Sequence, residues 1–295
     1  MSANVTSTPT LQTSPNLAFE FVRSLAGELS TGKVDLPSFP EIAVRVRRVL
    51  SDPKSSTDQV VRVVGSEPAL AARLVRIANS ASLNRSGRPV GDLRTAINRI
   101  GYNMVRSAAI SFAMAQIRDA NKLAGLERYL KDIWERSTVV AAYSLVLART
   151  YSKVNPDEAM LAGIMHGIGK LYVLTRATSH PELLADTVML DGILRDWHAS
   201  IGKAILENWE FSEEMSSAVG AQNDHTREGP AAPDLHDVIA MAIVLASHHA
   251  DADGIDAEMD GLATAKRFGL NKERASLLMR ECASEVAALS DALGD

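Results

Sequence analysis

The sequence predicts an all-α fold. Apolar residues recur every three or four positions through most of the 295 residues, as in Leu17, Phe21 and Leu25 near the start. This spacing places them on one face of a helix. Residues that favour helix starts precede many of these segments, and the alternation typical of strands is nearly absent.

The first half of the chain predicts a series of short helices separated by helix breakers. Leu36–Pro40 contains two prolines, which exclude a regular helix there. Ser56 or Thr57 is expected to cap one helix, and Ser66, before Glu67-Pro68, the next. Gly101 is expected to interrupt the last one. The apolar faces cover residues 17–29, 42–50, 60–64, 70–77 and 93–112.

The second half predicts longer helices. One runs from Leu126 to about Thr150, and Asn155-Pro156 starts another that continues through His166 to Leu174. Further helices are expected from His180, around 197–208 and after Ser212. Residues 226–233 form a linker, and two last helices cover about 234–250 and 271–288. Trp134, Trp197 and Trp209 are expected to anchor the core.

Composition narrows the functional classes. Hydrophobic residues make up 46% of the chain, which is a globular composition, and 31 Lys and Arg stand against 36 Asp and Glu for a net charge of −5. Nucleic-acid binding is therefore not expected, although six arginines (Arg45, Arg47, Arg48, Arg62, Arg73 and Arg76) give the first lobe a basic surface, interpreted as solvated. Cys282 is the single cysteine and is expected to be buried and inert.

The location of the protein is expected to be the cytoplasm. No apolar run is long enough to cross a bilayer, and one cysteine allows no disulfide within the chain. Residues 1–16 are rich in Ser and Thr and lack the basic and apolar blocks of a secretory signal. They are interpreted as a disordered leader.

Several short motifs together resemble the HDOD family, a relative of the HD metal-dependent phosphohydrolases. They are Leu36–Pro40, Glu67–Leu74, Ala78–Ala81, Leu93–Gly101, Met160–Leu171 and His198–Gly202. The resemblance implies two helical lobes, residues 17–120 and an HD-like lobe over 126–228, in a domain of residues 17–228. Residues 229–295 are then a C-terminal helical extension. It also implies a role in bacterial signal transduction.

The metal-binding pattern of HD phosphohydrolases is incomplete in this sequence. The family's first His falls at Arg136, and the Asp of its His-Asp pair falls at Gly167, after His166. His198 matches a later His, and Ser247-His248-His249 lies nearest to the final Asp. Arginine cannot ligate a metal, and glycine supplies neither charge nor ligand. We therefore expect no catalytic residue and no resident metal, although the remaining histidines can bind a divalent ion weakly.

The same residues point to an anion. Arg136, His166, Lys170 and His198 are predicted to line one vestigial cleft, where cationic groups favour a phosphate or a nucleotide. His166 and Lys170 are four residues apart and would share one helix face. The alternative is that Lys170 is a solvated surface charge and His166 a packed, hydrogen-bonded residue.

The sequence leaves three hypotheses open for the function of the protein. The leading hypothesis is a non-catalytic regulatory module that acts through a protein partner and responds to a small anionic ligand. The second is a residual metal-dependent phosphohydrolase with a His-rich site. The third is a transcriptional regulator, in which residues 66–81 form one helix of a helix-turn-helix, although no basic recognition helix is evident.

Overall fold

The protein is helical throughout the part that the structure describes. The computed structural model describes residues 15–30, 41–80, 83–84, 87–120, 126–227, 229, 231–255 and 257–294. Within these residues every regular element is an α-helix or a short 3₁₀-helix, which confirms the predicted fold class. The Leu36–Pro40 motif and most of the expected leader lie outside the described residues.

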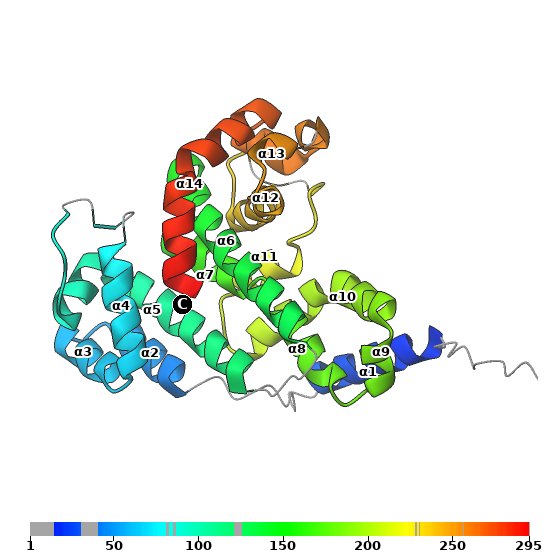
Figure 1. Ribbon diagram of the computed structural model, residues 1–295, viewed down its shortest axis with the longest axis horizontal. Helices are drawn as coiled ribbons and strands as arrows, with labels where there is room; N and C mark the ends of the chain where they lie inside the picture. The colour runs from blue at the N-terminus through cyan, green and yellow to red at the C-terminus, as the bar shows by residue number, and fades with distance from the viewer. Residues whose placement is uncertain are drawn as a thin grey trace, which may run out of the picture.

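The first lobe is a group of four helices. These are α2 (Glu41–Ser51), α3 (Thr57–Gly65), α4 (Pro68–Asn79) and α5 (Leu93–Ala120) (Figure 1). Ser56 caps α3 through a complete capping box with Gln59, as predicted. The expected cap at Ser66 is wrong: Glu67 is the N-cap of α4 and makes no side-chain cap hydrogen bond. The predicted interruption at Gly101 is a kink in α5, where φ is 77°.

The second lobe is built around α6 (Glu127–Tyr151), which confirms the predicted long helix. Every residue from 140 to 148 is buried, so neighbours cover this part of α6 on all sides. The lobe also contains α7 (Pro156–Met165), α8 (Ile168–Ala177), α9 (Pro181–Ala185), α10 (Thr187–Asn208), α11 (Glu213–Gly220) and α12 (Leu235–Ser247), of which α7, α8 and α12 contact α6. The helix expected around 197–208 thus begins ten residues earlier, after the side-chain cap of Asp186.

The first helix of the chain, α1 (Pro15–Ser30), lies on the second lobe. It packs against α10, far from α2 (Figure 1). Glu28 accepts hydrogen bonds from Tyr172 Oη at 2.8 Å and from Arg176 Nη2 at 2.5 Å. Phe21 meets His180 edge to face, with 5.1 Å between the ring centroids. Helix α1 therefore lies on the second lobe, although α2, the next described helix, belongs to the first.

The C-terminal segment joins the two lobes. It contains two short 3₁₀-helices and two α-helices, α13 (Ala263–Phe268) and α14 (Lys272–Gly294). Of these elements the sequence predicted only α14. Helix α14 packs along α6 and reaches α4 and α5 of the first lobe (Figure 1). There Arg73 and Ser111 both donate to the carbonyl oxygen of Leu293, the latter at 3.1 Å.

Two side chains depart from their predicted surroundings. Arg73, interpreted as solvated, is only 2% exposed, because it binds the C-terminal end of α14, where the helix dipole favours a cation. Trp197, expected in the core, is 46% exposed, because it lies on the outer face of α10, one residue before the buried His198. Among the described helices, none combines the length and the apolar composition that crossing a bilayer requires.

Helices α8 and α10 cross with their backbones almost in contact. A Cβ atom at Gly169 would lie 1.9 Å from the carbonyl oxygen of His198 and 2.8 Å from the amide nitrogen of Gly202. Neither neighbour is a flexible side chain, so only glycine fits at position 169. This crossing fixes Lys170 and His198, the next residue of α8 and the facing residue of α10, relative to each other.

We predict that Gly169→Ala separates the two helices and lowers the free energy of unfolding by about 1–3 kcal/mol or more, because backbone atoms must move to admit the methyl group. Urea unfolding followed by circular dichroism measures this loss. The matched control is Gly192→Ala on α10, whose Cβ would meet only a side-chain atom of Arg195 at 3.8 Å. Alanine there is expected to be neutral or to stabilise the helix by up to about 1 kcal/mol. Equal effects of the two variants would contradict the role of the crossing.

Candidate ligand-binding site

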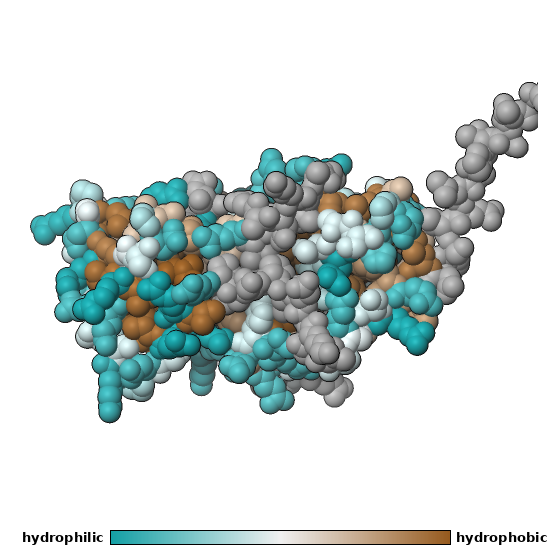
Figure 2. All heavy atoms as spheres, turned by 90° about the horizontal axis from the view of Figure 1, so that it is seen from below, coloured by the Kyte–Doolittle hydropathy of each residue, from teal (hydrophilic) through white to brown (hydrophobic). Residues whose placement is uncertain are grey.

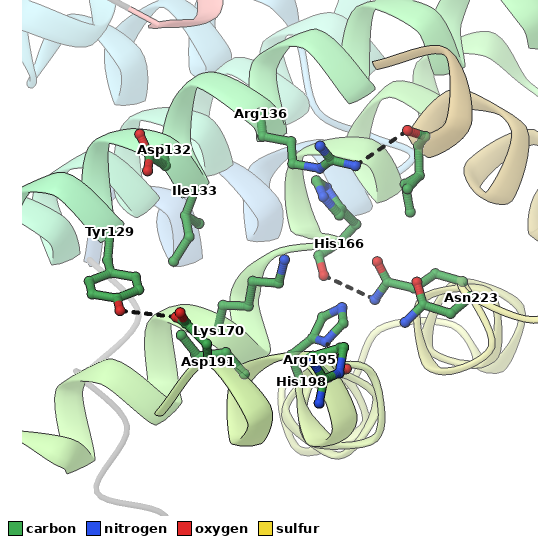
Figure 3. Close-up of a pocket in the computed structure, with 13 residues that line it drawn as sticks. Tyr129, Asp132, Ile133, Arg136, His166, Lys170, Asp191, Arg195, His198 and Asn223 are labelled. Carbon is green, nitrogen blue, oxygen red and sulfur yellow. Dashed lines mark hydrogen bonds between the residues drawn. The ribbon is translucent and has the colours of Figure 1, made fainter. Parts of the chain in front are cut away.

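The second lobe contains a cavity of about 570 Å³, within the range of pockets that bind small molecules. All four residues predicted for the cleft, Arg136, His166, Lys170 and His198, line it (Figure 3). The structure thus brings together residues from α6, α8, α10 and the turn after α7. Their role in binding a ligand stays a prediction.

Two helices supply the long walls of the cavity with the same spacing. Helix α6 contributes Tyr129, Asp132, Ile133 and Arg136, and α10 contributes Asp191, Leu194, Arg195 and His198. Each set follows the positions i, i+3, i+4 and i+7, which share one helix face. The hydroxyl of Tyr129 donates to Asp191 Oδ1 at 3.0 Å and ties the two walls together at one end (Figure 3).

The predicted single helix through His166 is wrong. Helix α7 ends at Met165, and α8 begins at Ile168 after Gly167, whose φ of −88° and ψ of 0° are not helical. Residue 167 faces α6 closely: a Cβ there would lie 3.0 Å from Ser137 Oγ and 3.2 Å from Ile133 Cγ2. His166 and Lys170 therefore reach the same cavity from the two sides of a turn, not from one helix face.

Both histidines are held neutral with a defined tautomer. His166 Nδ1 lies 2.7 Å from the carbonyl oxygen of Gly163, and His198 Nδ1 lies 3.1 Å from that of Arg195. A carbonyl only accepts, so Nδ1 carries the proton in both rings and Nε2 keeps its lone pair. Burial, together with the nearby charges of Lys170 and Arg136, lowers the pKa of His166 to about 3 and that of His198 to about 4.

The permanent charge in the inner cavity is positive. Burial, and secondarily the charge of Arg136, lowers the pKa of Lys170, and burial alone lowers the pKa of Arg136. Arg136 donates to Ser247 Oγ at 2.8 Å and to the carbonyl oxygen of Ile243 at 3.4 Å, both uncharged acceptors. Neither cation forms an ion pair with any carboxylate in the described part of the chain.

A buried glutamine adds an acceptor. Gln222 is fully buried and lines the cavity, and its Nε2 donates to the carbonyl oxygens of His166 at 3.1 Å and Val219 at 2.8 Å. Because both partners only accept, the amide orientation is determined. Its Oε1 has no hydrogen-bond partner among the described residues. An orphaned buried acceptor is costly and calls for a donor from a ligand or water.

These residues do not fit a catalytic metal centre. The pair of histidines offers two Nε2 ligands, but Gly167 supplies none, and Ser247, in the segment nearest to the family's final Asp, presents a hydroxyl that accepts from Arg136. Among the described residues, no third His, Cys, Asp or Glu side chain lies close enough to the two histidines to complete a group of three metal ligands. A catalytic divalent ion needs three or more protein ligands and usually a carboxylate, and Arg136 and Lys170 repel a cation.

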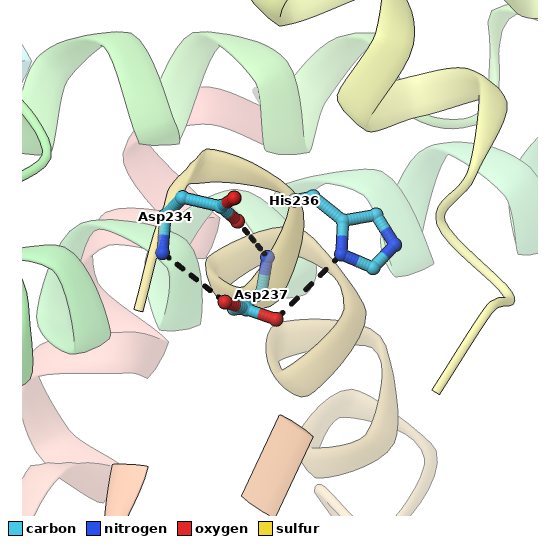
Figure 4. Close-up of side chains that lie close together, drawn as sticks. All are labelled: Asp234, His236 and Asp237. Carbon is cyan, nitrogen blue, oxygen red and sulfur yellow. Dashed lines mark hydrogen bonds and ion pairs between the residues drawn. The ribbon is translucent and has the colours of Figure 1, made fainter. Parts of the chain in front are cut away.

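The cluster whose ligand atoms do lie together is elsewhere and is already satisfied. Asp234, His236 and Asp237 meet at the start of α12 (Figure 4). Arg227 pairs with Asp234, and Arg267 holds Asp237 with Nε donating to Oδ2 at 2.9 Å. His236 Nε2 donates to the carbonyl oxygen of Ala221 at 2.8 Å. Two guanidinium groups thus occupy the place of a cation, and this cluster fixes Arg227 to the start of α12.

Sequence reasoning missed several residues of the cavity, above all Tyr129, Asp132, Asp191 and Gln222. The i, i+3, i+4, i+7 sets on α6 and α10 were a usable signal, since each places polar side chains on the same face as Arg136 or His198. Gln222 carried no such signal, because its orphaned oxygen depends on the carbonyls that its nitrogen finds in the folded chain.

We predict that His166 makes stability fall in acid. Its folded pKa of about 3 lies below the ordinary histidine pKa of 6.5, so the unfolded chain binds more protons between these pH values. Stability is then fully present above about pH 6.5 and is lost as pH falls, by about 1.4 kcal/mol per pH unit for this group. In His166→Asn, which keeps a donor to Gly163, urea unfolding from pH 7 to pH 4.5 should show a shallower loss. A slope equal to that of the wild type would rule out a buried neutral His166.

Comparison with known proteins places this fold. The chain is 27% identical to a candidate metal-dependent phosphohydrolase from Shewanella amazonensis SB2B, whose crystal structure matches 94% of this chain and 99% of that one with a TM-score of 0.73. An HDOD domain protein with unknown function from Geobacter sulfurreducens is 20% identical, with a TM-score of 0.66 over 93% of this chain and 98% of that one.

A candidate signal transduction protein from Marinobacter aquaeolei VT8 is 20% identical to this chain. Its crystal structure matches 97% of this chain and 68% of that one, with a TM-score of 0.65. At such identities the last two likenesses concern the fold alone. No curated protein is similar enough in sequence to match. The HDOD domain model, however, matches residues 36–225, well over half of the sequence. The chain therefore belongs to the HDOD domain family.

Proposed function

We propose that this chain is a non-catalytic regulatory module whose cavity binds a small phosphate-bearing anion and whose outer surface contacts a protein partner. The observation that carries the proposal is the pair Arg136 and Lys170, two half-buried cations in one cavity that form no ion pair with a carboxylate of the described residues. The role in signal transduction agrees with the family to which the chain belongs.

Electrostatics favours an anion in this cavity. With both histidines neutral, the inner end carries two positive charges that repel each other, and burial together with this repulsion lowers the pKa of Lys170. A phosphate between them would relieve this repulsion and accept charge-assisted hydrogen bonds from both side chains. Guanidinium and ammonium groups are the usual phosphate ligands in proteins.

The same charges argue against hydrolysis. A metal-activated water needs a cation held by several ligands, whereas this cavity offers two imidazoles and places fixed positive charges beside them. Without an activated water, a bound phosphate ester would be retained and not cleaved. This supports binding as the function of the site.

Helix α6 offers a route from the cavity to the first lobe. One of its faces lines the cavity through Arg136, and Thr138, on the neighbouring turn, hydrogen bonds to Ser290 of α14 at 2.7 Å. Arg149 forms a bidentate pair with Glu285, with both distances 2.7 Å. Because Arg73 of the first lobe binds the C-terminal end of α14, a shift of α6 would be transmitted through α14 to the first lobe. Hydrophobic side chains reach the surface of that lobe between hydrophilic ones (Figure 2), which suits a protein contact.

We predict that inorganic phosphate stabilises the protein and that Lys170→Met weakens this effect by about 10- to 100-fold in affinity, as expected for loss of one charged hydrogen-bond donor. At a concentration 100 times the dissociation constant, the free energy of unfolding should rise by about 2.7 kcal/mol. Thermal unfolding with increasing phosphate measures the effect. The control is Lys131→Met on the exposed face of α6, which should keep the wild-type response. Equal responses of the two variants would remove Lys170 from the site.

We predict no turnover of phosphodiesters or nucleotides with Mn²⁺, Mg²⁺ or Fe²⁺. The competing function, a residual phosphohydrolase, draws on one observation: both Nδ1–H groups are bound to carbonyls, which leaves two Nε2 lone pairs in the form that ligates metals. Elemental analysis of the purified protein separates the two. About one tightly held transition metal per chain, with hydrolysis abolished by His166→Ala, would establish the competing function.

A further inference from the structure

The cavity has opposite charge at its two ends. Along α6 the lining residues pass from Tyr129 and Asp132 through Ile133 to Arg136, and along α10 from Asp191 through Leu194 to Arg195 and His198. The acidic ends adjoin, because Tyr129 donates to Asp191. At the other end of the cavity, Arg136 and His166 lie beside each other (Figure 3). At the acidic end, Figure 3 shows Tyr129 and Asp191 joined by a hydrogen bond, with Asp132 apart from this pair on the same side of the cavity.

The helix geometry gives the distance between the ends. Seven residues separate Tyr129 from Arg136, and at 1.5 Å per residue they span about 10 Å. A ligand that reaches both ends therefore has a length of about 10 Å, which exceeds an inorganic phosphate. The cavity volume of about 570 Å³ leaves room for such a molecule.

The lining also specifies the chemistry along that length. The basic end suits a phosphate, and Ile133 and Leu194 offer an apolar middle to a flat ring. The carboxylates of Asp132 and Asp191 accept hydrogen bonds, so they suit N–H donors at the far end. The orphaned Oε1 of Gln222 and the two Nε2 lone pairs also need donors, which the hydroxyl groups of a sugar supply.

We propose that the ligand is a nucleoside monophosphate whose base carries N–H donors, with the phosphate at Arg136 and Lys170 and the base edge at Asp191 and Asp132. This inference rests on the proposed function and adds the acidic end as the part that selects the ligand. Guanine is the best match, because its Watson–Crick edge presents adjacent N–H donors that one carboxylate can accept together.

Calorimetric titration with two probes tests the inference: guanosine 5′-monophosphate, and ribose 5-phosphate, which lacks the base. The wild type should bind the nucleotide at least about tenfold more tightly than the sugar phosphate, since charged hydrogen bonds of this kind are lost with the base. The double variant Asp132→Ala/Asp191→Ala should lose most of this preference and bind ribose 5-phosphate as well as the wild type or better. Lys170→Met should weaken both probes.

The control is Glu207→Ala on α10, which removes one negative charge that is paired with Lys203 outside the cavity lining and should keep the preference. Circular dichroism verifies that each variant is folded. The side chain of Asp132 is 63% exposed and Asp191 is exposed, so neither change touches the core.

Equal binding of the two probes to the wild type, or an unchanged preference in the double variant, would overturn this inference and leave the proposed function standing. If neither probe nor inorganic phosphate binds the wild type, the proposed function fails, and this inference with it.

Discussion

The close crossing of α8 and α10 at Gly169 is the constraint on which the site depends. Backbone meets backbone there, so the position of Lys170 on one helix and His198 on the other is set by main-chain geometry, not by adaptable side chains. The turn at His166–Gly167 lets α8 approach α6 closely at the same time, since a Cβ at residue 167 would press against Ser137 Oγ and Ile133 Cγ2. The position at which the resemblance expects the carboxylate of HD phosphohydrolases thus packs against α6 in this chain.

Burying cations without acidic partners costs free energy, and the protein offsets that cost only in part. Arg136 donates to two neutral oxygens, from Ser247 and Ile243, and the ammonium group of Lys170 forms no hydrogen bond or ion pair with any described residue. The histidines respond by staying neutral, which limits the repulsion. Residues held in such a state are typical of sites built for a ligand of opposite charge. The ordinary alternative, a solvated Lys170, does not account for its burial among the cavity residues.

Much of this architecture could be predicted from the sequence, and the failures share a cause. The capping box at Ser56, the kink at Gly101 and the long α6 follow from local preferences, and all appear as expected. The motifs also predicted that Arg136, His166, Lys170 and His198 face one cleft. Local preferences could not reveal that Arg73 is buried by the end of α14, that Trp197 faces outward, or that α7 ends before Gly167. These depend on partners distant in the sequence: Leu293 is 220 residues from Arg73.

We propose above all that this cavity attracts an anion and not a divalent metal. Crystals soaked in equal concentrations of Mn²⁺ and arsenate, a phosphate analogue, would test this directly, since both elements scatter anomalously at separate wavelengths. We expect an arsenic peak between Arg136 and Lys170, and no manganese peak in the cavity. Manganese coordinated by His166 and His198, with a water completing its shell, would contradict it.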